Sequence, residues 1–252
     1  FDNPDEVREL GLHMLELDSA RNSAAAGGQW PGRRSDQVWN KDEKLAEMLT
    51  EKILSCYFNL DFEQVFFQLQ SLRFHLISRL DDDKNSRKNK GWIHRDSTDP
   101  RMLHHPNVEV MVNKKSPSHS DSDSTDYRGP TQLAGLIYLT PDIERNTGTS
   151  LFNMKKDKTL EDWDKTTEIR KEIHLGNPVN DKEAKEQWEN HRSCFDEKIR
   201  FENNYNSMIM YDTNEWHAAN NYYTSKNNRL TLGFFLGGIR ANKWPLERVK
   251  NI

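Results

Sequence analysis

The sequence has few cysteines, no long apolar run and no large excess of charge of either sign. Its 252 residues include 2 Cys, Cys56 and Cys194, and no Cys-x-x-Cys pair that would indicate a zinc site or a disulfide framework. We expect two reduced thiols, with a single disulfide between them as the alternative. No apolar run approaches the ~18 residues of a membrane span, and no signal-type segment is present. We therefore expect a cytoplasmic protein without a membrane partner.

The charge balance bears on which partners the protein can have. Lys and Arg number 36 against 40 Asp and Glu, for a net charge of −4. Neutralising phosphates requires clustered excess basic charge, so nucleic acid is not an expected partner. A chain of this length can bury one sizeable core, and we predict a single domain over residues 1–252.

The first 60 residues predict supporting helices. Asn3, Pro4 and Glu6 form a helix-start pattern, and apolar residues then recur at helical spacing. A second helix is predicted from about Asp42 to Tyr57, with Asn40 and Glu43 as a capping box. The Gly- and Pro-containing stretch 27–34 is predicted to be a loop.

The remainder of the chain predicts a β core over residues 62–153 and 199–238. Apolar residues alternate with polar ones at 65–69 and 74–76, and compact strand signals follow at 133–139, 147–152, 208–211, around 217 and at 230–236. Residues 154–198 are strongly charged and predict a helical or loop insertion, while 114–130 form a polar loop. The fold class is therefore α+β, mainly β, with an antiparallel sandwich or jelly roll at its core.

Three residues predict a metal site. His94 and Asp96 lie two apart on a strand, so their side chains share a side, and His217 follows another strand. Two histidines and one carboxylate leave three positions of an octahedral ion open, the arrangement of non-heme Fe(II) oxygenases. The alternatives are a surface histidine beside a solvated Asp96, and a hydrogen-bonded core histidine at 217.

Arg229 predicts an anion site. It opens the apolar strand 229–236, and Thr231 lies on the same face. An arginine directed into a core is costly unless an anion meets it, and a carboxylate held by Arg229 with a hydroxyl donor beside it would justify the pattern. The alternative is a solvated strand edge, at which Arg229 pairs with a surface acid.

In this order, the motifs resemble the 2-oxoglutarate/Fe(II) oxygenase superfamily, especially its prolyl-hydroxylase-like branch. The matching pieces span residues 91–236 and are His94-x-Asp96, the strand Leu136 to Thr140, the turn Gly148 to Phe152, His217 and Arg229-x-Thr231. The sequence departs from the family pattern where Thr147-Gly148-Thr149 replaces a double glycine and where the insertion 154–198 interrupts the core.

The resemblance implies a double-stranded β-helix supported by the N-terminal helices. It implies His94, Asp96 and His217 as Fe(II) ligands, and Arg229, Thr231 and Tyr138 as the residues that bind the co-substrate 2-oxoglutarate. It implies a dioxygenase that uses O2 to hydroxylate an unactivated C–H bond of a small molecule or a peptide residue, prolyl residues included. Succinate and CO2 are released, and ascorbate is a reductant for such enzymes.

Three other functions stay open at this stage. The first is a nucleic-acid demethylase of the same superfamily, although Phe235 stands where those relatives carry a second arginine. The second is a non-catalytic jelly-roll binding protein, and the third is a cupin-like zinc enzyme using His104 and His105. Trp30, Arg33, Arg34 and Trp92, with the loop 114–130, are candidates for the pocket rim, and a structural role is the alternative for each of them.

Overall fold

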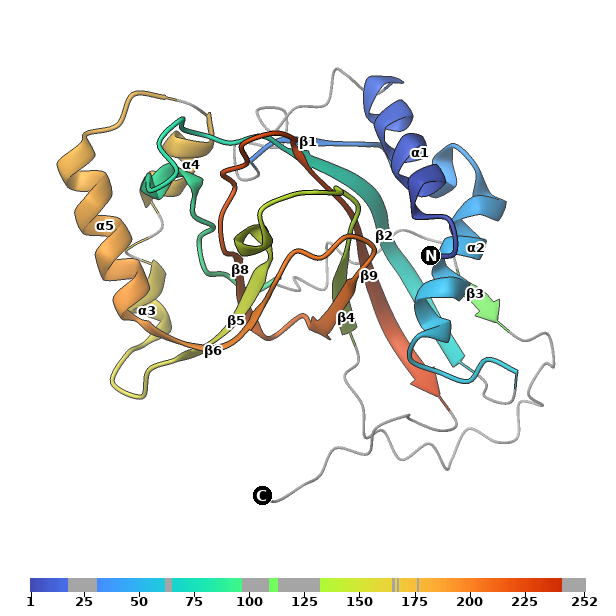
Figure 1. Cartoon of the computed structure of the whole chain (residues 1–252). Helices are drawn as coiled ribbons and strands as arrows, with labels where there is room; N and C mark the ends of the chain where they lie inside the picture. The colour runs from blue at the N-terminus through green and yellow to red at the C-terminus, as the bar shows by residue number, and fades with distance from the viewer. Residues whose placement is uncertain are drawn as a thin grey trace.

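The structure is a computed structural model, shown in Figure 1. It describes residues 1–17, 31–61, 65–96, 109–112, 132–164, 166, 168–175 and 177–241. Trp30, His104, His105 and the loop 114–130 lie outside the described residues. Helices and antiparallel strands together confirm the predicted α+β class with a mainly β core.

Two helices form within the first 60 residues, as predicted. They are α1 (Pro4–Leu17) and α2 (Glu43–Ser55). The predicted capping box at Asn40 is wrong, because Asn40 ends the short 3-10 helix η1 (Val38–Asn40). Asp42 is the N-cap of α2 instead, and its carboxylate accepts a hydrogen bond of 3.0 Å from the Leu45 amide.

The larger sheet is built around two long strands. Its order is β1 (Arg33–Arg34), β2 (Val65–Ile77), β9 (Arg229–Ala241), β4 (Gln132–Tyr138) and β7 (Met208–Asp212), with β3 (Glu109–Val112) also paired to β2. All these pairs are antiparallel. The predicted loop at 27–34 is wrong for Arg33 and Arg34, which pair with Leu76 and His75. A strand of two residues has no periodicity from which it could be predicted.

The smaller sheet has the order β6 (Phe195–Phe201), β5 (Thr149–Met154) and β8 (Trp216–Ala219). Residues 91–94 lie alongside β8 through an isolated antiparallel bridge between His94 and His217. The two sheets contact each other through their inner side chains, since Tyr138 on β4 bonds Thr149 on β5. Because β6 begins at Phe195, the β core resumes before residue 199.

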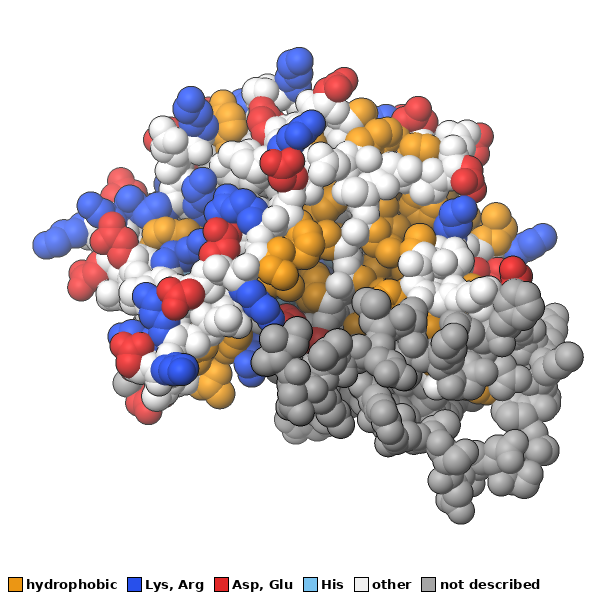
Figure 2. Space-filling view, turned by 60° about the horizontal axis from the view of Figure 1, so that its bottom comes forward, with side chains coloured by type: hydrophobic (Ala, Val, Ile, Leu, Met, Phe, Trp, Pro, Cys, Tyr) orange, Lys and Arg blue, Asp and Glu red, His pale blue; other side chains and the backbone are white. Residues whose placement is uncertain are grey.

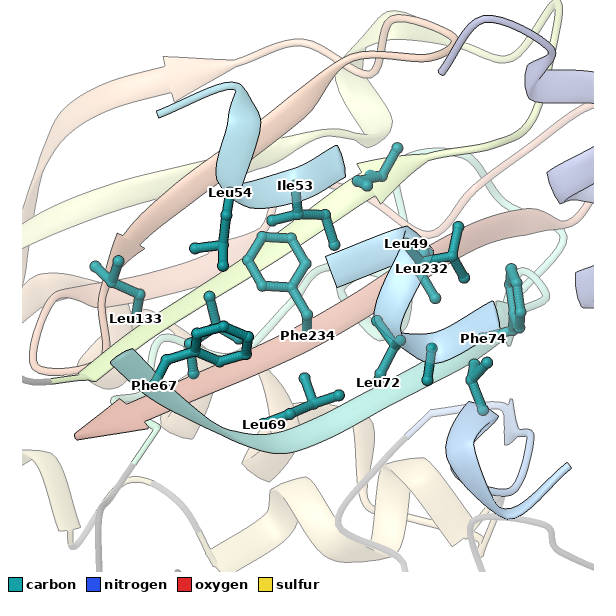
Figure 3. Close-up of a cluster of buried hydrophobic side chains, with 14 of the residues drawn as sticks. Leu49, Ile53, Leu54, Phe67, Leu69, Leu72, Phe74, Leu133, Leu232 and Phe234 are labelled. Atoms are coloured by element: carbon teal, nitrogen blue, oxygen red, sulfur yellow. The ribbon is translucent and has the colours of Figure 1, made fainter. Parts of the chain in front are cut away.

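The main apolar core lies between the larger sheet and the two N-terminal helices. Figure 3 shows side chains of α2 packed on β2, β4 and β9. The side chains of this core that the figure labels are Leu49, Ile53, Leu54, Phe67, Leu69, Leu72, Phe74, Leu133, Leu232 and Phe234. Gly11 of α1 lies against the Phe74 ring, so closely that an added Cβ would stand 2.4 Å from the ring. The outer face of the larger sheet is thus covered, and its inner face is directed toward the smaller sheet.

The charged insertion is helical where it is described. It contains α3 (Leu160–Asp164), α4 (Glu168–Leu175) and α5 (Asp181–Ser193), which lie beside the smaller sheet at the side of the molecule away from α1 and α2 (Figure 1). Acidic and basic side chains are mixed over this side (Figure 2). Trp92 is buried against Ile169 and Ile173 of α4, so it packs the insertion onto the core, which favours the structural alternative over a place on the pocket rim.

Two further predictions concern the thiols and the membrane. Both cysteines are free; Cys56 is exposed and Cys194 is buried. Among the described residues, no helix is both long enough and apolar enough to cross a membrane.

Candidate metal centre

The bridge between residue 94 and β8 brings the two predicted histidine ligands together. The amide of His94 donates to the carbonyl of His217 (3.0 Å), and the amide of His217 donates to the carbonyl of His94 (2.9 Å). Residues directly opposite on antiparallel strands direct their side chains to the same side. The two imidazole centroids are accordingly 4.4 Å apart.

Asp96 completes a cluster of three potential ligands. Its carboxylate oxygens lie 3.3 Å from Nε2 of His217 and 3.8 Å from Nε2 of His94. One ligand atom from each residue lies within 4.8 Å of the others. Within the described part of the chain, this is the one group of three or more such side chains that could hold a metal ion.

Backbone carbonyls fix the orientation of both imidazole rings. Nδ1 of His94 lies 2.8 Å from the Trp92 carbonyl, and Nδ1 of His217 lies 3.0 Å from the Glu215 carbonyl. A carbonyl can only accept, so Nδ1 of each ring donates, and Nε2 is the ring nitrogen that lies near Asp96. Outer hydrogen bonds of this kind orient metal-bound histidines.

The protonation states also suit a cation. Burial, then the neighbouring His217, lowers the pKa of His94 well below its ordinary value, so this ring is neutral at neutral pH. Burial raises the pKa of Asp96, while His217, Arg34 and Arg170 act in the opposite direction. Neutral imidazole and carboxylate are the forms that bind metals, and a dication would offset the cost of burying the carboxylate charge.

Arg229 and Thr231 present unused hydrogen-bonding atoms on the inner face of the larger sheet. Arg229 is only 2% exposed, and its Nε donates to the carbonyl of Thr147 at 2.8 Å. Its Nη2 and the Oγ1 of Thr231 are both buried with no hydrogen-bond partner. Leaving such atoms unpaired costs about 1–3 kcal/mol each, which a bound carboxylate would relieve.

Tyr138 lies beside these two residues. It is directly opposite Thr231, and its ring centroid is 5.4 Å from the Arg229 guanidinium carbon. Its hydroxyl donates to Oγ1 of Thr149 at 2.9 Å, so only its acceptor lone pairs are open to a ligand. Tyr138 is therefore placed next to the predicted anion site, but its hydrogen is already used within the protein.

Tyr211 links the histidine cluster to the arginine. Its ring is 4.7 Å from the ring of His217, and its hydroxyl interacts electrostatically with Asp96, Tyr138 and Arg229. Burial, followed by Asp96, raises the pKa of Tyr211 well above its ordinary value. The predicted metal ligands and the predicted anion site thus share one interior between the sheets.

A transverse row of polar side chains extends this interior to the edge of the larger sheet. Arg34, His75, Thr231 and Tyr138 lie directly opposite one another on four consecutive strands, and so on one face. An added Cβ on Gly233 would stand 2.6 Å from the His75 ring, so this glycine makes room for the imidazole. Burial, then Arg73, lowers the pKa of Arg34 to about 10, and Asp96 opposes this shift. His75 and Tyr211 were not predicted as site residues; their polar side chains within predicted strands were the available signal.

A family model establishes the family. Residues 107–236 match the model described as a family of unknown function, DUF6445, and the chain belongs to this family. No curated protein matches the sequence.

Solved structures provide a distant likeness. HygX from Streptomyces hygroscopicus, solved with nickel and 2-oxoglutarate bound, has 11% sequence identity and a TM-score of 0.46, covering 94% of this chain and 78% of that one. HygX solved with hygromycin B as well has 11% identity and a TM-score of 0.33, covering 68% of this chain and 56% of that one. At these values the likeness tells nothing about the activity of this chain.

Proposed function

We propose that this protein is an Fe(II)- and 2-oxoglutarate-dependent dioxygenase. The observation that supports this function best is the pairing of two features in one interior. One is a cluster of two histidines and a carboxylate, with both Nε2 atoms within 3.8 Å of a carboxylate oxygen. The other is the buried, unpartnered pair Arg229 Nη2 and Thr231 Oγ1. A cation and a carboxylate-bearing co-substrate would satisfy both features.

The residues have distinct proposed roles. His94, Asp96 and His217 would bind the iron and leave three positions open, two for 2-oxoglutarate and one for O2. Arg229 and Thr231 would hold the far carboxylate of 2-oxoglutarate, with Tyr138 as a packing partner beside them. When bound, iron and 2-oxoglutarate supply the oxidative decarboxylation that uses O2, releases succinate and CO2 and provides an oxygen atom for a C–H bond. Ascorbate is proposed as a supporting reductant.

The sheet orders support a double-stranded β-helix. Strands alternate between the sheets along the chain: β2 in the larger sheet, residues 91–94 beside the smaller, β4 in the larger, then β5 and β6 in the smaller. β7 returns to the larger sheet, β8 to the smaller and β9 to the larger. We propose that residues 1–252 are one such oxygenase domain, acting in the cytoplasm on a small-molecule or peptide C–H bond, prolyl residues included.

The co-substrate anchor provides the direct test. Protein reconstituted anaerobically with Fe(II) should acquire a weak visible absorption band when 2-oxoglutarate is added, and should release succinate slowly after exposure to O2. Arg229→Ala should lose both signals, because it removes the carboxylate partner; a charged hydrogen bond of this kind contributes about 1.5–3 kcal/mol, or roughly 10- to 150-fold in affinity.

The matched control is Arg79→Ala, which removes an exposed arginine paired with Asp82 at 2.8 Å. This variant should retain the band and the succinate release. If Arg229→Ala and Arg79→Ala behaved alike, the assignment of Arg229 as the co-substrate anchor would be wrong.

A further inference from the structure

The strand segment that carries His94 is an edge with no neighbouring strand on one side among the described residues. On the β8 side, the amide of Gly91 donates to the Ala219 carbonyl, and His94 exchanges two hydrogen bonds with His217. Consecutive residues of an antiparallel strand direct their backbone groups to opposite sides. The amide and carbonyl of Ile93 therefore point away from β8.

Two side chains of the insertion bind these two backbone groups of Ile93. The amide of Ile93 donates to Nε2 of His191 on α5 at 2.9 Å. Nε1 of Trp163 on α3 donates to the carbonyl of Ile93 at 3.0 Å. Ile93 is 1% exposed, so neither group could be left unpaired cheaply. An imidazole and an indole thus occupy the place of an adjacent strand.

His191 and Trp163 are also joined to each other by hydrogen bonds through Thr166. Because Nε2 of His191 accepts, its proton lies on Nδ1, which is 2.9 Å from Oγ1 of Thr166. The Thr166 hydroxyl in turn donates to the carbonyl of Trp163 at 2.6 Å. Burial, then Arg192 and Arg170, lowers the pKa of His191 to about 3, which keeps the ring neutral and able to accept.

Aromatic packing also connects the insertion to the residue next to the second histidine, His217. The Trp163 ring lies 5.1 Å from the ring of Trp216, the residue before His217. The guanidinium of Arg95, between His94 and Asp96, lies 4.5 Å from the centroid of the same Trp216 ring. The insertion therefore contacts residues adjacent to each of the two histidines.

We propose that Trp163 and His191 are positioning residues for the metal: by holding Ile93, they fix the direction in which His94 and Asp96 approach the ion. This inference rests on the proposed metal site, but it concerns residues that bind neither metal nor co-substrate. It also assigns a role to the insertion. Side chains of its helices bind the edge of the strand segment that carries His94, where no neighbouring strand lies among the described residues. Residues in such outer positions commonly alter metal affinity about 10- to 100-fold.

Co(II) is the probe, because its visible spectrum reports both binding and ligand geometry without turnover. In the full chain, His191→Phe keeps a buried ring but cannot accept from Ile93, and Trp163→Phe keeps an aromatic ring against Trp216 but cannot donate. Each should raise the dissociation constant of Co(II) about tenfold or more and change the spectrum of the bound ion. In His191→Gln, the side-chain amide oxygen can accept from the backbone amide of Ile93. This variant should therefore keep much of the Co(II) affinity that His191→Phe loses.

Trp188→Phe is the matched control. Its ring lies on α5, 5.3 Å from the ring of Trp92, and stacks on the ring of His191. The two backbone groups of Ile93 are bound by His191 and Trp163, so Trp188→Phe tests the aromatic packing alone. It should lower the melting temperature and leave Co(II) affinity unchanged.

Two results would overturn the inference, and they are distinguishable. If His191→Phe and Trp163→Phe lowered only the melting temperature, as Trp188→Phe should, the two residues would be ordinary core residues and the proposed function would stand. If the parent chain bound Co(II) no better than His94→Ala does, the metal site itself would be refuted, and the positioning role with it.

Discussion

Thr231 and Arg229 each bury a polar atom that gains no hydrogen bond from the described protein. Such an atom lowers stability in the unliganded chain, since it loses water and receives nothing in return. A buried hydroxyl elsewhere in the protein is satisfied: Thr50 on α2, also fully buried, donates to the Ala46 carbonyl at 2.7 Å. The two unpaired atoms are the ones that the proposed co-substrate would satisfy.

Replacing the Thr231 hydroxyl should separate stability from binding. In Thr231→Val, a methyl group takes the place of the unpaired hydroxyl, so the free energy of unfolding should stay level or rise by up to about 1 kcal/mol. The affinity for 2-oxoglutarate should fall about five- to tenfold, since one hydrogen bond to the carboxylate is lost. Urea unfolding and titration of the metal-loaded protein measure the two quantities.

Thr50→Val is the matched control, because it removes a satisfied hydroxyl of equal burial. It should destabilise the protein without affecting 2-oxoglutarate. Were Thr231→Val to cost as much stability as Thr50→Val and leave the affinity unaltered, the hydroxyl would have no part in binding.

At this scale, residue type and spacing indicated the three metal-ligand candidates and the arginine but left structural alternatives open, and the resemblance to the oxygenase superfamily favoured the ligand roles. His94, Asp96 and His217 were predicted as one cluster, and the structure brings them together; their role as ligands stays a prediction. His191 was missed because its importance depends on a contact between α5 and a distant strand. No pattern within the charged stretch 154–198 indicates which of its residues face the core.

The helices and strands differ in how much local sequence determines them. α1 and α2 were predicted because each repeats apolar residues on one face, and the long strands because they alternate. The two-residue β1 and the Asp42 cap were missed. Both are short polar segments whose structure depends on one particular partner, β2 for β1 and the Leu45 amide for Asp42. β2 was predicted as two short strands, but it is continuous and accommodates irregular pairing with β9 through register shifts.

The contact between α1 and β2 provides a test of the fold at the level of elements. Gly11→Ala would place a methyl group about where the fully buried Phe74 ring lies. Alanine favours a helix by about 1 kcal/mol, yet we expect a net loss of about 1–3 kcal/mol because the packed ring must move. Chemical denaturation measures the change.

The double variant Gly11→Ala/Phe74→Leu should recover part of that loss relative to the sum of the two single variants. Leu17→Ala, at an exposed position of the same helix, should have little effect. A gain in stability from Gly11→Ala alone would show that helix propensity outweighs packing at this contact.

On the scale of the whole molecule, the two-sheet arrangement was predicted only as a class. Strand order could not be deduced, because β2 pairs with β9 from the other end of the chain and β4 lies between β9 and β7. Such pairing is chosen by the combined burial of both faces rather than by any local signal. The position of the insertion beside the smaller sheet was likewise not available from its composition.

Joint binding of metal and 2-oxoglutarate should stabilise the entire fold, because the site joins both sheets. At about 100 times its dissociation constant, one bound ligand adds about 2.7 kcal/mol to the free energy of unfolding. For a chain of this size, that corresponds to a rise of roughly 5–10 °C in melting temperature. Thermal melts with Co(II) and 2-oxoglutarate measure the shift. EDTA should reverse it, and His217→Ala should show none; an equal shift in that variant would place the ion elsewhere.

The bridge between His94 and His217 also determines when the site can come into being. A ribosome produces His94 long before it produces His217, and Arg229 emerges later still. Until β8 has been made and has paired with the earlier segment, the imidazoles of His94 and His217 do not lie side by side. If the proposed metal site is correct, an ion can be held by all three residues only after that pairing.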